Sequence, residues 1–262
     1  MSLPPELQRA LDSAATVPRL LVTSDFDGTL APIVNNPADA RPLPVAADAL
    51  VTLAGLPSTT TALISGRALA TLRALSALPA TVHLVGSHGA EFDTTSTTGK
   101  GTGFAHDIDQ QLLQRITDGL SAIAEGKPGV AVETKPASVA LHVRNASTAD
   151  GETALAAAWD AAAGWDAHVT TGKAVLEFAV ISTDKGEAVD ILRNEHHASA
   201  VVFFGDDVTD EKAFVRLGDS DVGVKVGPGE TAATYRIDSP EDVAEALQYL
   251  AAQRGRHLPD QQ

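Results

Sequence analysis

Hydrophobic residues along the chain fall into short runs that end abruptly in polar residues or glycine. Three such runs cover residues 20–24, 60–64 and 200–204. Apolar runs of this length are typical of parallel strands that are buried on both faces. The stretches 68–75 and 210–217 follow two of these runs and have the apolar spacing of helices. This alternation of strands and helices predicts a doubly wound α/β fold with a parallel sheet.

Three further segments extend the same pattern. Strands are expected over residues 82–85 and 222–226, which are short and mostly apolar. A last helix is expected over residues 241–250, because Asp238, Ser239 and Pro240 before it are typical of a helix start.

The middle of the chain has a different pattern. Residues 94–103 are rich in Thr, Ser and Gly and predict a loop or hinge. An α-β-β-α-β-β order is expected after it, with helices over 108–124 and 151–163 and strands over 129–134, 138–144, 167–171 and 174–180. We interpret residues 104–180 as an α/β cap domain inserted into a core that is formed by residues 1–103 and 181–262.

The composition limits the partners of this chain. The net charge of the 262 residues is −15, which argues against a nucleic acid or an anionic membrane as partner. An anionic substrate would need a local cluster of cations and a bound metal. The chain has no cysteine, which excludes disulfides and thiolate metal sites. No signal-peptide pattern is found over residues 1–17 and no apolar run approaches ~20 residues, so we expect a cytoplasmic protein of unassigned oligomeric state.

Two aspartates stand where the first apolar run ends. Asp25 and Asp27 are two positions apart, and in an extended chain such side chains share one face. Their carboxylates can therefore converge, although they repel each other unless a proton or a cation separates them. One could act as a nucleophile and the other could transfer protons beside a hard divalent metal. A simple turn at Asp27-Gly28 is the alternative.

A second acidic group follows the run at 200–204. Asp206 and Asp207 come directly after it, and Asp210 and Glu211 follow within one turn. Acids at a helix start are favourable, and this alternative explains Asp210 and Glu211 better than the first two. Ligands made only of oxygen favour Mg²⁺, which we expect as the cofactor.

Two polar residues are candidates for binding an anion. Ser65 lies between a predicted strand and a predicted helix, so its hydroxyl and nearby N–H groups could hold one, although an ordinary helix cap is the alternative. Lys185 opens a helix that runs to Arg193, and a solvated lysine is the alternative there. In a doubly wound sheet, ligands bind at the carboxyl ends of the strands, where Asp25, Ser65 and Asp206 all fall.

These segments occur in the order D-x-D-G-T, strand-end Ser, Lys and G-D-D-x-x-D, which resembles the haloacid dehalogenase superfamily of phosphohydrolases. The resemblance implies that Asp25 attacks phosphorus to form an aspartyl-phosphate. It implies that Asp27 first protonates the leaving oxygen and then activates water, while Ser65 and Lys185 hold phosphate oxygens. The metal-binding residues that it implies, directly or in support, are Asp25, Asp27 through its carbonyl, Asp206, Asp207 and Asp210.

A narrower resemblance rests on G-S-H-G-A-E at 86–91, together with I-S-G-R and G-D-D-x-T-D-E. These motifs are similar to those of trehalose-6-phosphate phosphatases, which implies hydrolysis of trehalose 6-phosphate to trehalose and phosphate in trehalose biosynthesis. The charged pattern of the insert resembles the cap of that family. The implied substrate-binding residues are Arg67, Glu133, Lys135, Arg144, Lys173 and Glu177.

The expected strands would place Glu133 and Lys135 on one face, and likewise His142 and Arg144. A solvated sheet face is the alternative. His88 is expected to be structural or to lie where the cap meets the core. Two other functions remain open: a phosphatase for another sugar phosphate, such as sucrose or glucosylglycerate phosphate, and a non-catalytic sugar-phosphate sensor.

Overall fold

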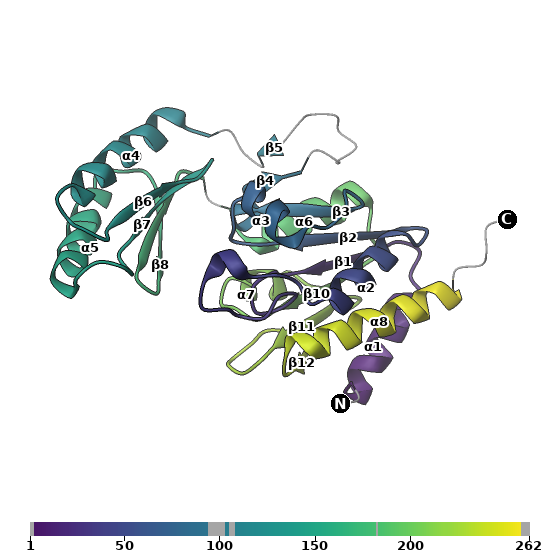
Figure 1. Ribbon diagram of the computed structural model, residues 1–262. Helices are drawn as coiled ribbons and strands as arrows, with labels where there is room; N and C mark the ends of the chain where they lie inside the picture. The colour runs from purple at the N-terminus through teal and green to yellow at the C-terminus, as the bar shows by residue number, and fades with distance from the viewer. Residues whose placement is uncertain (1–2, 94–102, 105–107, 182, 258–262) are drawn as a thin grey trace. The chain divides into compact units, whose positions relative to one another are not determined.

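The computed structural model describes residues 3–93, 103–104, 108–181 and 183–257 (Figure 1). The predicted loop over 94–103 lies outside the described residues, apart from Gly103. The chain divides into two compact units, Met1–Gly103 with Thr183–Gln262, and Phe104–Ser182.

The first unit is built on an eight-stranded sheet with the order β12-β11-β10-β1-β2-β3-β4-β5. The pairs from β12 to β3 are parallel, and β4 is antiparallel to β3. This confirms the doubly wound α/β fold and adds an antiparallel strand that the sequence pattern did not predict. The strands are β1 (Leu20–Ser24), β2 (Thr59–Ile64), β3 (Val82–Gly86), β4 (Glu91–Phe92), β5 (Gly103–Phe104), β10 (Ala200–Gly205), β11 (Val222–Val226) and β12 (Tyr235–Ile237).

Helices cover both faces of this sheet. The helices are α1 (Pro5–Ala15), α2 (Pro44–Ala54), α3 (Leu69–Ser76), α6 (Lys185–His196), α7 (Glu211–Phe214) and α8 (Pro240–His257), with short 3₁₀ turns η1 (Pro37–Asp39) and η2 (Ser87–Gly89). Leu20 and Val22 of β1 pack in one apolar cluster with α1, α2, α3 and α8, whereas Leu21 packs with α6 and α7. Burial on both faces is why β1 begins with three apolar residues, and its Thr23 and Ser24 are buried as well.

Three details differ from the sequence-based prediction. Helices α1 and α2 were not predicted. Helix α8 extends well beyond the expected 241–250. Helix α7 ends at Phe214 instead of continuing to Leu217, because the N–H groups of Arg216 and Leu217 bond to carbonyls three residues back, as in a 3₁₀ turn.

The second unit is a four-stranded antiparallel sheet with the order β6-β7-β9-β8, covered by two helices. Its elements are α4 (Gln110–Ala124), β6 (Ala131–Thr134), β7 (Ser138–His142), α5 (Thr148–Ala162), β8 (His168–Gly172) and β9 (Val175–Ala179), which confirms the predicted order. Alternate residues such as Val139, Leu141 and Phe178 pack against the helices. Strand β7 ends at His142, so the expectation that Arg144 continues this strand is wrong; Arg144 lies in the following turn.

No helix of the described residues is long and apolar enough to cross a membrane. The cytoplasmic location stays a prediction.

A buried arginine joins the last helix to the rest of the first unit. Arg254 of α8 is 1% exposed. Its guanidinium donates to the carbonyls of Ala15 and Ser58, at 3.0 Å each, and to the carbonyl of Val17. These carbonyls belong to the end of α1, to the loop that follows it and to the turn before β2, so one side chain fixes three segments. Burial lowers the pKa of Arg254.

We predict that Arg254→Ala lowers the free energy of unfolding by about 3 kcal/mol, because several carbonyls lose their donor. Urea denaturation of the two purified proteins measures the change. Arg256→Ala is the matched control, because Arg256 lies two residues further along α8 and is exposed. Its loss should lower the free energy of unfolding by less than about 0.5 kcal/mol. Equal losses in both variants would contradict the role given to Arg254.

Candidate active site

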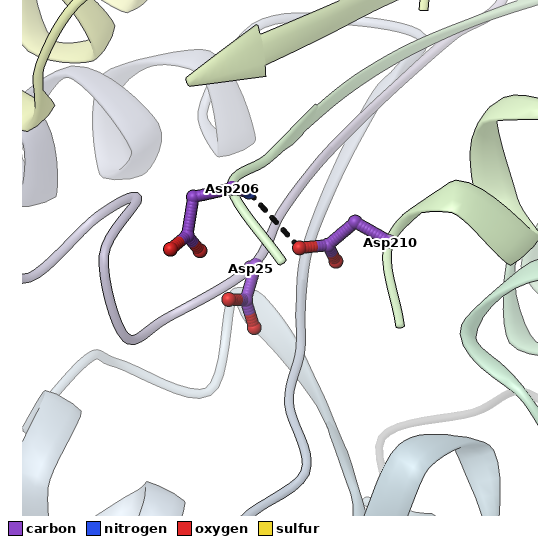
Figure 2. Close-up of side chains that lie close together, drawn as sticks. All are labelled: Asp25, Asp206 and Asp210. Atoms are coloured by element: carbon purple, nitrogen blue, oxygen red, sulfur yellow. Dashed lines mark hydrogen bonds between the residues drawn. The ribbon is translucent and has the colours of Figure 1, made fainter. Parts of the chain in front are cut away.

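Three aspartates meet at the carboxyl ends of the central strands. Asp25 follows β1, Asp206 follows β10 and Asp210 precedes α7. One carboxylate oxygen from each lies within 4.8 Å of the others, and Figure 2 shows the three side chains gathered at this point. The N–H of Asp25 also donates to the carbonyl of Phe204 at 2.9 Å, so the first two strand ends are held in register.

Lys185 lies among these carboxylates at the start of α6. Its Nζ is 2.8 Å from Oδ1 of Asp25 and 2.7 Å from Oδ1 of Asp210, and the three side chains are almost completely buried. Burial raises the pKa of Asp25 well above its usual range, and Lys185 offsets only part of this. Burial would lower the pKa of Lys185, but the charges of the two aspartates outweigh it and raise that pKa.

Asp210 also orders the end of strand β10. Its second oxygen, Oδ2, accepts from the N–H groups of Asp206 at 3.0 Å and Asp207 at 2.9 Å (Figure 2 draws the first). Both oxygens of Asp210 therefore have donors. The carboxylate of Asp207 accepts from the N–H of Val208 and is not one of the three that meet. Asp207 is thus outside the group of three, although sequence analysis assigned it to the metal.

The turn after β1 brings Asp206 close to the backbone. Gly28 has a φ of +85°, and a Cβ at this position would lie 2.1 Å from Oδ2 of Asp206. Glycine is therefore required both for the conformation and for the space. Thr29 donates to Oδ1 of Asp206 at 3.1 Å. Burial raises the pKa of Asp206, and the charge of Asp210 adds to the effect.

Asp27 forms a two-pronged ion pair with Arg67. Nε and Nη2 of Arg67 lie 2.6 and 2.7 Å from the two carboxylate oxygens, and the guanidinium carbon is 5.6 Å from the centre of the Phe26 ring. Ser65 lies at the base of the same loop, where its Oγ accepts from the N–H of Arg67 at 3.2 Å. Arg67, which sequence analysis assigned to the substrate, here holds the second aspartate of the D-x-D pair.

The charged residues of the second unit form their own groups. Oε1 of Glu177 accepts from Nζ of Lys135 at 2.9 Å and from Oγ of Ser138 at 2.6 Å. Oε2 of Glu133 is 2.8 Å from Nε2 of His142. Glu133 and Glu177 flank Ala140 from either side in the strand register, so they share a sheet face. Two more predicted residues, Arg144 and Lys173, are exposed in turns.

Lys225 is a residue of the site that sequence analysis missed. It is buried near the end of β11, its Nζ donates to the backbone carbonyl of Asp206, and Oε1 of Glu211 is 4.0 Å away. The available signal was a single charge inside the otherwise apolar run V-G-V-K-V. A buried lysine requires a partner, so that isolated charge indicated a residue with a polar contact elsewhere in the fold.

The donor set fits a hard divalent cation. The group of three contributes only carboxylate oxygens, and Lys185 supplies one positive charge against three negative ones. Burial first, and the charge of Asp210 in addition, raise the pKa values of Asp25 and Asp206. Mg²⁺ prefers carboxylate oxygens and would balance the remaining charge.

Solved structures share this fold. The C-terminal domain of Candida albicans trehalose-6-phosphate phosphatase matches with a TM-score of 0.74 and 26% identity, over 96% of this chain and 98% of that one. A haloacid dehalogenase-like hydrolase from Bacteroides thetaiotaomicron matches with a TM-score of 0.67 and 13% identity, over 88% and 98% of the two chains. The chain has the haloacid dehalogenase-like fold, and its acidic centre lies at the carboxyl ends of the central strands.

Sequence comparison identifies the family to which the chain belongs. The profile of the trehalose-phosphatase family matches residues 23–241. The trehalose-phosphate phosphatase of Mycobacterium marinum is 37% identical over 270 residues, which cover 97% of this chain and 67% of that protein. The chain belongs to the trehalose-phosphatase family. It spans about two thirds of the length of the mycobacterial relative.

Proposed function

We propose that the protein hydrolyses trehalose 6-phosphate to trehalose and phosphate, as a step of trehalose biosynthesis. The observation that carries the proposal is the buried group of Asp25, Lys185 and Asp210 at the strand ends, in a chain of the trehalose-phosphatase family. The solved relative from Candida albicans and the curated one from Mycobacterium marinum are both named for this phosphatase activity.

Asp25 is the proposed nucleophile. An oxygen of its carboxylate attacks phosphorus, the bond from phosphorus to the sugar oxygen breaks, and an aspartyl-phosphate forms. Asp27 gives a proton to the departing 6-hydroxyl oxygen of trehalose. In the second step water attacks phosphorus and loses a proton to Asp27, and the bond to Asp25 breaks to release phosphate. The ion pair with Arg67 fixes the direction of the Asp27 carboxylate, and one of its two oxygens must leave Arg67 to carry the proton that Asp27 gives up.

Positive charge and hydrogen-bond donors must hold the phosphoryl oxygens during both steps. Lys185 and Ser65 are the proposed donors, and the carboxylates that keep Lys185 charged also keep its Nζ in place. The residues proposed to hold Mg²⁺ are Asp25, the Asp27 carbonyl and Asp206, with Asp210 and Asp207 in support. When bound, Mg²⁺ would neutralise charge on the phosphoryl group and lower the repulsion between it and Asp25.

The second unit is the proposed sugar-recognition domain. Glu177 with Lys135, and Glu133 with His142, place acids and bases on one sheet, where they can exchange hydrogen bonds with sugar hydroxyls. Arg144 and Lys173 are the proposed additional cations. A phosphatase for sucrose or glucosylglycerate phosphate would use the same core with other cap contacts. A non-catalytic sensor is disfavoured because both aspartates of the D-x-D pair are present.

We predict that Asp25→Asn abolishes phosphate release, because a neutral amide cannot attack phosphorus. Asp27→Asn should lower kcat by about a hundredfold or more, because the amide cannot transfer the proton. Stopped-time phosphate assays at saturating substrate measure both. Asp219→Asn is the control, since Asp219 is exposed and lies just before the amino end of β11, at the opposite edge of the sheet from the carboxyl ends. Wild-type turnover in Asp25→Asn would refute the assignment of Asp25 as the nucleophile.

We expect activity to require a divalent cation. Chelation with EDTA should remove phosphate release, and added Mg²⁺ should restore it. Mg²⁺ without substrate should also raise the melting temperature of the wild type, because binding to the folded state stabilises it. Asp206→Asn should lose this thermal shift, whereas Asp219→Asn should keep it. Full activity after exhaustive chelation would exclude a requirement for a divalent cation.

A substrate panel tests the sugar assignment. Trehalose 6-phosphate should give the highest kcat/KM, above sucrose 6-phosphate, glucosylglycerate phosphate and p-nitrophenyl phosphate. Glu133→Ala and Glu177→Ala should lower kcat/KM for trehalose 6-phosphate about tenfold or more, and should spare p-nitrophenyl phosphate, because lost polar partners cost about 1–3 kcal/mol. Glu152→Ala, on the exposed side of α5, is the control.

Two outcomes of this panel would contradict the assignment. Equal losses on both substrates would mean that Glu133 and Glu177 support the fold and do not recognise the sugar. A clear preference for sucrose 6-phosphate would move the assignment to that substrate.

A further inference from the structure

The turn over residues 86–91, sequence G-S-H-G-A-E, contacts the loop that carries Ser65 and Arg67. The N–H of Ser87 donates to the carbonyl of Arg67 at 2.8 Å, and the N–H of His88 donates to the carbonyl of Ser65 at 3.0 Å. Two successive backbone donors therefore fix the loop on either side of Gly66.

The same turn also reaches the segment that carries Lys185. A Cβ on Gly89, whose φ is +107°, would lie 2.8 Å from the carbonyl oxygen of Asp184 and 3.3 Å from Cβ of Ala188. At the other end of the turn, a Cβ on Gly86 would lie 2.5 Å from the backbone nitrogen of Leu69. The turn is therefore packed tightly between the loop at 65–67 and the start of α6.

A buried carboxylate holds this turn in place. Oε1 of Glu91 accepts from Oγ of Ser87 at 2.5 Å and from the N–H of Leu69 at 3.2 Å. Leu69 is the first residue of α3, and the side chain of the preceding Ala68 offers no cap. Glu91 thus supplies the missing acceptor and ties the turn to the helix that follows the loop.

The centre of the turn is strained. Ser87 and His88 have φ values of +48° and +55°, in the left-handed region that residues other than glycine seldom occupy. Such strain persists where surrounding contacts determine the conformation, and it gathers at functional sites. In this conformation the imidazole of His88 lies against Gly66, where a Cβ would lie 2.4 Å from Cε1 and 2.5 Å from Nε2 of the ring.

We propose that His88 is a positioning residue for phosphoryl transfer. Its ring packs on Gly66 and fixes the loop at 65–67, so that the Ser65 hydroxyl and the Arg67 guanidinium are set relative to Lys185. Arg67 in turn holds Asp27. The inference rests on the proposed function in so far as Ser65, Lys185 and Asp27 act in the reaction, and it does not depend on which sugar is bound.

Gly66 offers a sharp test, because its φ lies outside the left-handed region and the three atoms nearest to a Cβ there all belong to the His88 ring. With p-nitrophenyl phosphate as substrate, Gly66→Ala should lower kcat about tenfold or more, since the new methyl group displaces the loop. His88→Ala should lower kcat about tenfold, since the loop loses its support. The double variant should match His88→Ala, because the methyl group then has room.

His88→Asn separates the ring from the backbone. Asparagine tolerates the left-handed conformation, so this variant should keep a melting temperature near that of the wild type while its kcat falls as in His88→Ala. A residue with a merely structural role would change the melting temperature and leave kcat intact in the folded protein.

Two results would overturn the positioning role. One is a wild-type kcat in folded His88→Asn. The other is a double variant whose kcat loss is the product of the two single losses, since the ring would then not be what opposes Cβ at position 66. If the wild-type protein releases no phosphate from any monoester, the proposed function and the positioning role are refuted together. The two variant results above, in contrast, would refute the positioning role alone.

Discussion

The ammonium of Lys185 and its two carboxylate partners place the strongest constraint on the fold. An unpaired buried charge costs several kcal/mol, so Lys185 at the start of α6 must meet Asp25 and Asp210. These three residues come from distant parts of the chain, and they can meet only if β1 and β10 are neighbours with their carboxyl ends together. One arrangement of the strands therefore accounts for both the central strand order and the candidate active site.

Local charge explains how an acidic chain could act on an anion. The net charge of −15 would repel a phosphate monoester at long range. At the strand ends, however, Lys185, Lys225 and Arg67 gather beside the acids, each with an acidic or carbonyl partner. The proposed Mg²⁺ would add the remaining positive charge. Each cation is fixed by bonds within the protein, so the site need not be reorganised when charge develops on the phosphoryl group.

Much of this arrangement could be predicted from the sequence, because it depends on local patterns. The ends of β1 and β11 follow directly from where their apolar runs stop, and the D-x-D pair is visible as a spacing. The contacts of Arg67 and Lys225 could not be predicted, since each depends on a partner that only the tertiary fold brings near. Arg144 was assigned to a strand because the apolar alternation continues to Val143, whereas the ladder ends one residue earlier.

The central claim is that phosphate leaves the sugar through a covalent intermediate on Asp25. Each in-line displacement inverts the configuration at phosphorus. Two displacements therefore give net retention of configuration, whereas a single direct attack by water gives inversion. The decisive measurement is hydrolysis of a phosphorothioate analogue of the substrate, made chiral at phosphorus with oxygen isotopes, in isotopically labelled water. Retention of configuration in the released thiophosphate is the predicted result, and inversion would contradict the aspartyl-phosphate mechanism.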